Sequence, residues 1–132
     1  MSAGVPAEVL GDLLWSCGGG PWPSRQELSD AIGAYQREIR GDAGRWSPDE
    51  RVLSVPHIDV VWEDFSSDGD PEVARIASAD GGGLTALDLM WGIEQAFGAR
   101  IAPLDHHFFE GLALRRETAS EAIPCYDLQL GS

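Results

Sequence analysis

The chain has 132 residues and contains no lysine, so its nine basic residues are all arginine. Asp and Glu together number 22, which gives a formal net charge of −13 at pH 7. A molecule with so few cations repels phosphate backbones and anionic lipid, so we expect neither a nucleic acid nor a membrane as its partner. The same charge favours encounter with a basic protein through long-range attraction.

Cysteine is scarce as well, because the chain has only Cys17 and Cys125. Two cysteines so far apart make no disulfide framework, so we expect buried thiols in a reducing cytoplasm, with one bridge from the N-terminal region to the last strand as the alternative. No apolar run is long enough to span a bilayer. The first apolar stretch, residues 9–14, follows no basic residue and is interrupted by Gly11 and Asp12, so we expect no cleaved signal peptide.

The sequence has enough apolar residues for a packed domain. Its hydrophobic fraction is 43% and it contains five Trp, whereas disordered acidic tails are poor in both. A chain of this length fits one domain that buries roughly 65 to 70% of the surface exposed by the unfolded chain. We therefore expect a single folded domain over residues 1–132.

Two segments in the first third have the apolar spacing of helices. Residues 6–16 begin at Pro6 and are followed by a run of glycines, which predicts a short first helix. In residues 24–40, Ser24 is positioned as the N-cap and Gly41 as the left-handed C-terminal stop. We expect this second helix to bury Leu28, Ile32, Tyr35 and Ile39 and to expose Gln26, Asp30, Gln36, Arg37 and Arg40.

A third helix is expected over residues 85–97. Thr85 is positioned as the N-cap with Asp88 at the third helical position, and Gly98 is expected to end the helix. Its apolar stripe is wide enough for a helix that lies across a sheet: Ala86, Leu89, Met90, Trp91, Ile93 and Phe97.

Four segments have strand patterns. Residues 58–63 alternate in polarity, and an Asp-Gly turn signal separates them from residues 72–78, which predicts an antiparallel hairpin. Residues 106–114 and 125–130 predict two further strands. The expected fold class is α+β, with helices packed on a mainly antiparallel sheet of about four strands.

The segment DHHFFEG, residues 105–111, pairs two histidines with two carboxylates but does not suit a metal ion. His106 and His107 point to opposite faces of a strand, and the helical HExxH spacing is absent. We therefore expect no metal and no cofactor. The alternative function is a small metal-dependent enzyme or metal-binding protein that uses His106 or His107 with Asp105, Glu110 or His57.

Three other motifs are incomplete. The loop of residues 64–70 begins like an EF-hand, but Arg75 stands where the loop needs a bidentate Glu. The glycines at 81–83 precede a helix, but acidic residues flank them and no lysine is present, so a tight turn is expected rather than a phosphate site. Cys17 lies at the end of the first expected helix, where the helix dipole disfavours a thiolate, so we expect no nucleophile there.

One acidic cluster remains as a candidate site. Between residues 59 and 72 the chain has six acidic residues and no basic one, with two aromatic residues among them. Aromatic anchors surrounded by charge are typical of protein-binding hot spots. The residues expected to bind a partner are Asp59, Trp62, Glu63, Asp64, Phe65, Asp68, Asp70 and Glu72. In the alternative interpretation, Trp62 faces the core and the acids only keep a hairpin edge soluble.

Three segments of the C-terminal third, LTALDLMWGIEQAFGARI, DHHFFEGLAL and PCYDLQLGS, resemble small acidic bacterial proteins that serve as immunity partners of secreted polymorphic toxins. This resemblance implies a cytoplasmic protein without catalysis that binds one cognate toxin domain and blocks it, and it implies no individual functional residue. Many such toxins attack nucleic acids through basic sites, which an acidic surface can occupy competitively. A third interpretation is an adaptor subunit of a larger assembly.

Overall fold

The computed structural model describes residues 5–41, 46–63, 70–105, 107–115 and 123–131. Its elements are β1 (Glu8–Val9), α1 (Arg25–Arg40), β2 (Arg51–Leu53), β3 (His57–Trp62), β4 (Glu72–Ala77), β5 (Leu84–Thr85), α2 (Ala86–Ile101), β6 (Phe108–Leu114) and β7 (Cys125–Gly131). Five strands form one sheet in the order β1-β6-β7-β3-β4, and β2 pairs with β5 in a small second sheet. The fold is α+β, as the sequence predicts.

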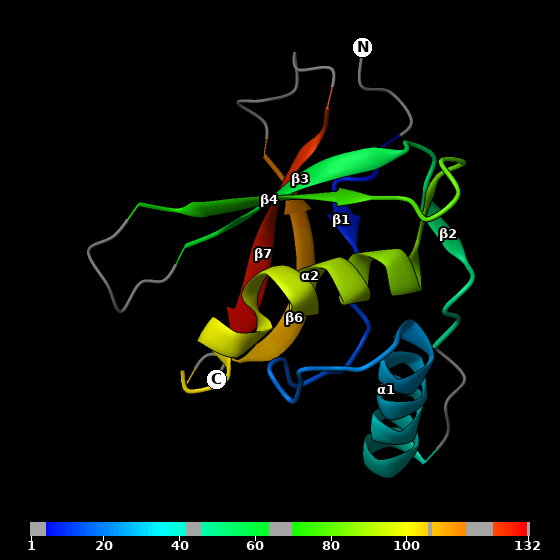
Figure 1. Cartoon of the computed structure of the whole chain (residues 1–132), viewed down its shortest axis with the longest axis vertical. Helices are drawn as coiled ribbons and strands as arrows, with labels where there is room; N and C mark the ends of the chain where they lie inside the picture. The colour runs from blue at the N-terminus through cyan, green and yellow to red at the C-terminus, as the bar shows by residue number, and fades with distance from the viewer. Residues whose placement is uncertain (1–4, 42–45, 64–69, 106, 116–122, 132) are drawn as a thin grey trace.

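The main sheet is antiparallel except at its centre, where β3 runs parallel to β7. The predicted hairpin of β3 and β4 is confirmed, with Ile58 opposite Ile76 and Trp62 opposite Glu72. Because β4 is last in the strand order, it forms an edge of the sheet. Helix α2 lies across one face of the sheet, and α1 packs beside α2 (Figure 1).

The core lies between α2 and the sheet. Leu89, Ile93 and Phe97 on α2 are buried as the stripe predicts, and Tyr126 of β7 is fully buried with them. Gly92 brings α2 close to β4, because a Cβ atom there would lie 2.7 Å from Cγ2 of Ile76. The face of α2 that carries Gly92 therefore packs against the edge strand β4.

The N-terminal cap of α2 is confirmed. The Thr85 hydroxyl accepts a hydrogen bond from the Asp88 N–H, and the Asp88 carboxylate accepts one from the Thr85 N–H. The predicted stop at Gly98 is wrong, because the helix continues to Ile101, which is fully buried. A Cβ atom at Gly98 would lie 2.9 Å from Oε1 of Glu94, so this glycine makes room for a side chain instead of ending the helix.

Helix α1 has the predicted caps but not the predicted solvent face. The Ser24 hydroxyl accepts a hydrogen bond from the Glu27 N–H, and Gly41 adopts a left-handed conformation with φ 88°. The helical pattern predicts an exposed Gln36, but this residue is buried, because its side chain forms hydrogen bonds with both the N–H and the carbonyl of Leu14. The same pattern predicts a buried Ile39, but this residue is 58% exposed.

The predicted helix over residues 6–16 is wrong. Glu8 and Val9 instead form β1, which pairs with β6, and Ser16 bridges Phe108 farther along the same strand. Leu13, Trp15 and Cys17 are buried while the residues between them are half-buried, so this segment alternates with the period of a strand. Of the helices that the structure describes, neither is long and apolar enough to cross a membrane.

Candidate functional site

Two acids of the predicted binding segment are paired with arginine. Asp59 on β3 lies opposite Arg75 on β4, and its two carboxylate oxygens lie 2.8 and 3.1 Å from the guanidinium nitrogens Nε and Nη2. Glu72 at the start of β4 forms an ion pair with Arg100 of α2. Their charges are therefore offset within the molecule.

Trp62 is part of the core and is not a surface anchor. It is 4% exposed, and its ring centroid lies 5.6 Å from that of Phe97. Of the remaining predicted residues, Glu63 and Asp70 are exposed at the ends of the hairpin strands. Asp64, Phe65 and Asp68 lie outside the described residues, as does most of the loop that begins like an EF-hand.

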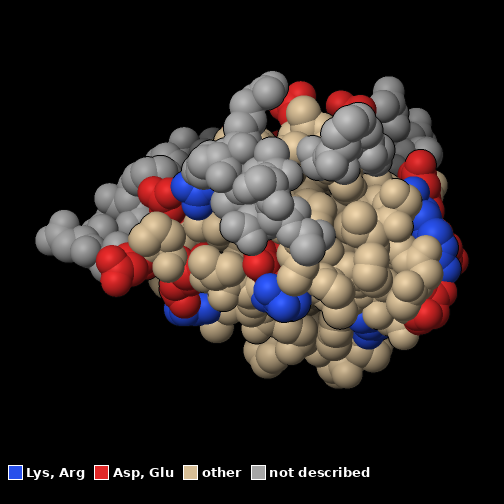
Figure 2. Space-filling model, turned by 90° about the horizontal axis from the view of Figure 1, so that it is seen from above, with Lys and Arg blue, Asp and Glu red and all other residues tan. Residues whose placement is uncertain are grey.

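Carboxylates are not confined to the hairpin. On the face shown in Figure 2, they lie on both sides of the molecule, and guanidinium groups lie beside them. Further ion pairs join Arg25 to Asp88, Arg51 to Asp80 and Arg115 to Asp127. In the described part of the chain, five arginines thus pair with carboxylates.

The glycine-rich loop before β5 already holds an anion of its own. The Asp80 carboxylate accepts a hydrogen bond from the Gly82 N–H at 2.9 Å and lies 2.5 Å from the guanidinium of Arg51. Arg51, the Gly82 N–H and the Ser78 hydroxyl hold the pKa of Asp80 well below its usual range. The loop therefore forms the tight turn that the sequence predicts, and the structure adds that the Asp80 carboxylate closes it.

The histidines do not assemble a metal centre in the part of the chain that is described. No group of three or more His, Cys, Asp or Glu side chains among these residues is close enough to hold a metal ion. His107 Nδ1 instead forms a 2.8 Å hydrogen bond with the Ser16 hydroxyl, which ties the N-terminal segment to the end of β6. His106 lies outside the described residues.

A buried carboxylate that the sequence does not point out holds the N-terminal segment in place. Glu94 of α2 is 7% exposed and accepts hydrogen bonds from the indole N–H groups of Trp15 at 2.9 Å and Trp22 at 3.1 Å. The Gly18 N–H donates to the same carboxylate at 3.1 Å. Burial and then the Glu94 charge raise the pKa of the adjacent Cys17 thiol, which disfavours its thiolate form. Both cysteines are buried thiols.

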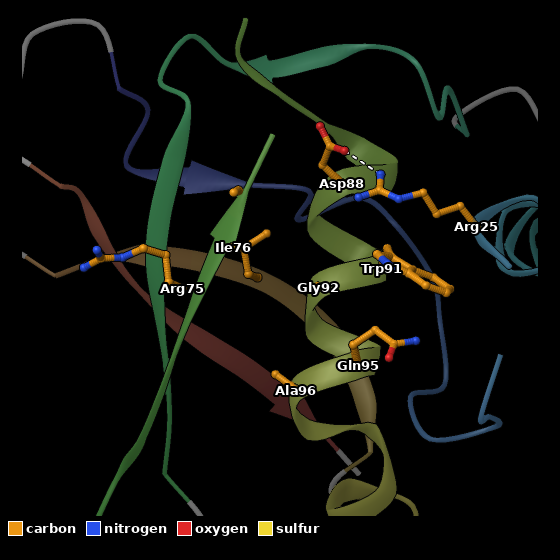
Figure 3. A pocket seen from close by; sticks show the side chains of 9 residues that line it. Arg25, Arg75, Ile76, Asp88, Trp91, Gly92, Gln95 and Ala96 are labelled. Atoms are coloured by element: carbon orange, nitrogen blue, oxygen red, sulfur yellow. Dashed lines mark hydrogen bonds and ion pairs between the residues drawn. The ribbon is translucent and has the colours of Figure 1, made fainter. Parts of the chain in front are cut away.

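An open groove of about 320 Å³ lies between β4 and α2. Figure 3 shows β4 on one side of it and Trp91 with Arg25 on the other, with Gly92 between them. Arg75 also lines the groove, and its guanidinium group extends across β3, where it donates a hydrogen bond to Asp59.

The far wall of the groove is fixed in position by an ion pair. Arg25 Nη1 lies 2.6 Å from Oδ1 of Asp88, and the guanidinium carbon of Arg25 lies 5.9 Å from the centre of the Trp91 ring. Burial by itself would raise the pKa of Asp88, but hydrogen bonds from Thr85 and Arg25 give a net lowering. Asp88 therefore stays ionised, and the half-exposed Trp91 is held by a cation above its ring.

Sequence reasoning missed both the Glu94 cluster and the groove. The groove joins residues from α1, β4 and α2, and its one sequence signal is Gly92 in the middle of a helical apolar stripe. Comparisons of the chain with family models, with curated proteins and with solved structures found no match.

Proposed function

We propose that this chain is a cytoplasmic binding protein that neutralises a cognate basic protein toxin through its acidic surface, as an immunity protein does. The observation that supports the proposal is the state of its charges. Five arginines are already paired with carboxylates of the same chain, so they do not offset the remaining acidic surface. The exposed acidic residues include Glu8, Glu27, Asp30, Glu38, Asp49, Glu50, Glu63, Asp70, Asp105 and Glu110.

Such a surface attracts a cationic protein over a long range and speeds the encounter between the two. A toxin that cleaves or modifies nucleic acid needs a positively charged site for its substrate, and an acidic protein that covers this site blocks it. The resemblance of the C-terminal third to toxin immunity partners supports the same function.

The test begins with the neighbouring gene. A small basic C-terminal domain of a secreted protein encoded beside this chain is expressed in bacteria with and without it. We expect growth to stop with the toxin domain alone and to recover when this chain is present. Calorimetry on the purified pair should give an affinity that falls steeply as salt is added.

Two matched double variants then test which part of the acidic surface binds the partner. Glu63→Gln with Asp70→Asn removes two charges from the hairpin, and Glu27→Gln with Asp30→Asn removes two from α1. We expect about a tenfold loss of affinity for the hairpin variant and less than about threefold for the α1 variant. Absence of binding at low salt, or growth inhibition that this chain does not relieve, would contradict the proposed function.

A further inference from the structure

The geometry points to the free edge of β4 as a strand-addition site, where an extended segment of the basic partner pairs with the sheet and lies over the groove beside α2. This inference rests on the proposed function and assigns the surface that carries it out.

The backbone of β4 offers hydrogen-bonding groups on that edge. The Ser78 N–H donates to the Pro56 carbonyl at 2.8 Å, so the even-numbered residues of β4 direct their backbone groups toward β3. By the alternation of an antiparallel ladder, Val73, Arg75 and Ala77 direct their N–H and carbonyl groups away from β3. Within the described residues no strand lies on this side of β4. The edge therefore presents a ready template for another strand.

This edge also lacks the features that normally prevent strand addition. Proteins protect such edges with proline, bulges or charged side chains. Strand β4 has neither proline nor a register shift, and Val73 on its outer face is 61% exposed. Its one charged residue on that face, Arg75, is held by Asp59 on β3.

The groove supplies space for the side chains of the added strand. Neighbouring strands lie about 4.8 Å apart, so a strand beside β4 would run along the groove, whose α2 side is lined by Trp91, Gln95 and Ala96. Alternate side chains of that strand would point toward α2, and one of them would lie beside Trp91, which Arg25 and Asp88 hold in place. An apolar side chain suits this position.

Charge decides which kind of segment fits. Exposed Glu63 and Asp70 lie at the end where β4 begins. A second copy of this chain would bring the same acids and a net charge of −13 to the interface, so pairing of two copies is opposed by repulsion. A segment that alternates basic with apolar residues satisfies both the acidic end and the groove.

The experiment uses the full chain and a fluorescent peptide in which arginine alternates with valine. The control is the same peptide with every second amide N-methylated, which removes the donors on one edge and keeps the charge. Fluorescence anisotropy at low salt gives the two affinities. We expect the unmodified peptide to bind at least about tenfold more tightly.

Two variants at one position separate the backbone from the side chain. Val73→Pro removes the outward N–H, a change that edge strands tolerate, while Val73→Thr keeps it. Binding of the unmodified peptide should weaken about tenfold for Val73→Pro and stay within about twofold for Val73→Thr. Hydrogen exchange on the unchanged protein is the second measurement, and the peptide should slow exchange at the backbone amides of residues 73, 75 and 77. This measurement tests pairing with β4 even if Val73→Pro fails to fold.

Each outcome has a distinct meaning. Equal binding of both peptides, with no slowing of exchange on β4, would overturn the strand-addition site while leaving an acidic binding protein in place. No binding of either peptide at low salt would count against the proposed function as well. A dimer in light scattering that Val73→Pro dissociates and Val73→Thr does not would show that β4 pairs with a second copy, which overturns the basic partner.

Discussion

Glu94 is the residue on which the placement of the N-terminal segment depends. Its carboxylate accepts hydrogen bonds from Trp15, Trp22 and Gly18, which lie more than 70 positions earlier in the chain. An ionised carboxylate has acceptor oxygens for all of these donors, so the arrangement is fully satisfied. A neutral amide at this position would replace one acceptor with a donor.

We therefore expect Glu94→Gln to lower the free energy of unfolding by about 1 to 3 kcal/mol, because an indole or backbone N–H then faces an NH₂ group inside the protein. Urea unfolding followed by tryptophan fluorescence measures the change. Glu38→Gln, at an exposed position of α1, is the control and should stay within about 0.5 kcal/mol of the unchanged protein. Equal stability of the two variants would show that the Glu94 contacts contribute little.

At the scale of elements, local signals predict α1 and α2 well because caps and apolar stripes are properties of neighbouring residues. Ser24, Gly41 and Thr85 cap the helices as their positions indicate. Residues 6–16 show where local signals fail. Their apolar residues fit a helix, but the open edge of β6 accepts them as a strand, and that edge is about 100 positions away.

The packing of α2 on β4 gives a prediction about Gly92. In Gly92→Ala the new Cβ atom would lie within 2.9 Å of three carbon atoms of the buried Ile76 side chain. We expect a loss of about 1 to 3 kcal/mol of stability through overpacking, which exceeds the gain in helix propensity. The thermal midpoint and urea unfolding measure it.

Gly33→Ala in α1 is the matched control, because a Cβ atom there meets Trp46 at an ordinary 3.4 Å. With no clash, the helix propensity of alanine should raise stability by up to about 1 kcal/mol. If both alanine variants change stability in the same direction, the close approach of α2 to β4 does not depend on Gly92.

At the scale of the whole molecule, the sequence predicts the sign of the charge but not its arrangement. The acids between residues 59 and 72 are adjacent in the chain, which is why they form a visible cluster. The partners of Asp59 and Glu72 are Arg75 on the next strand and Arg100 on a helix, and only the folded sheet brings them together. The β4 groove depends on the same tertiary arrangement, so the sequence pattern could not reveal it.

Because the chain has no lysine, few of its side chains change charge at alkaline pH. Arginine stays charged throughout, so of the side chains that normally titrate above pH 8 only two Cys and two Tyr are present. Tyr126 is buried, which raises the pKa of its hydroxyl to about 12. That hydroxyl donates a 2.7 Å hydrogen bond to the Pro6 carbonyl. Burial also raises the pKa of Cys17.

The raised pKa values of Tyr126 and Cys17 both make the free energy of unfolding fall as the pH rises. The folded protein keeps the Tyr126 proton to about pH 12, whereas the unfolded chain loses it near pH 10, so the unfolded state binds fewer protons in this interval. The free energy of unfolding should therefore fall as pH rises from about 10 to 12, by up to about 1.4 kcal/mol per pH unit from this residue. In Tyr126→Phe the fall should be shallower, and stability below pH 9 should be lower by about 1 kcal/mol because the bond to Pro6 is lost. Urea unfolding across this pH range measures both effects, with Tyr35→Phe as the comparison. If the free energy of unfolding falls equally steeply with pH in Tyr126→Phe and in the unchanged protein, the Tyr126 hydroxyl does not govern alkaline unfolding.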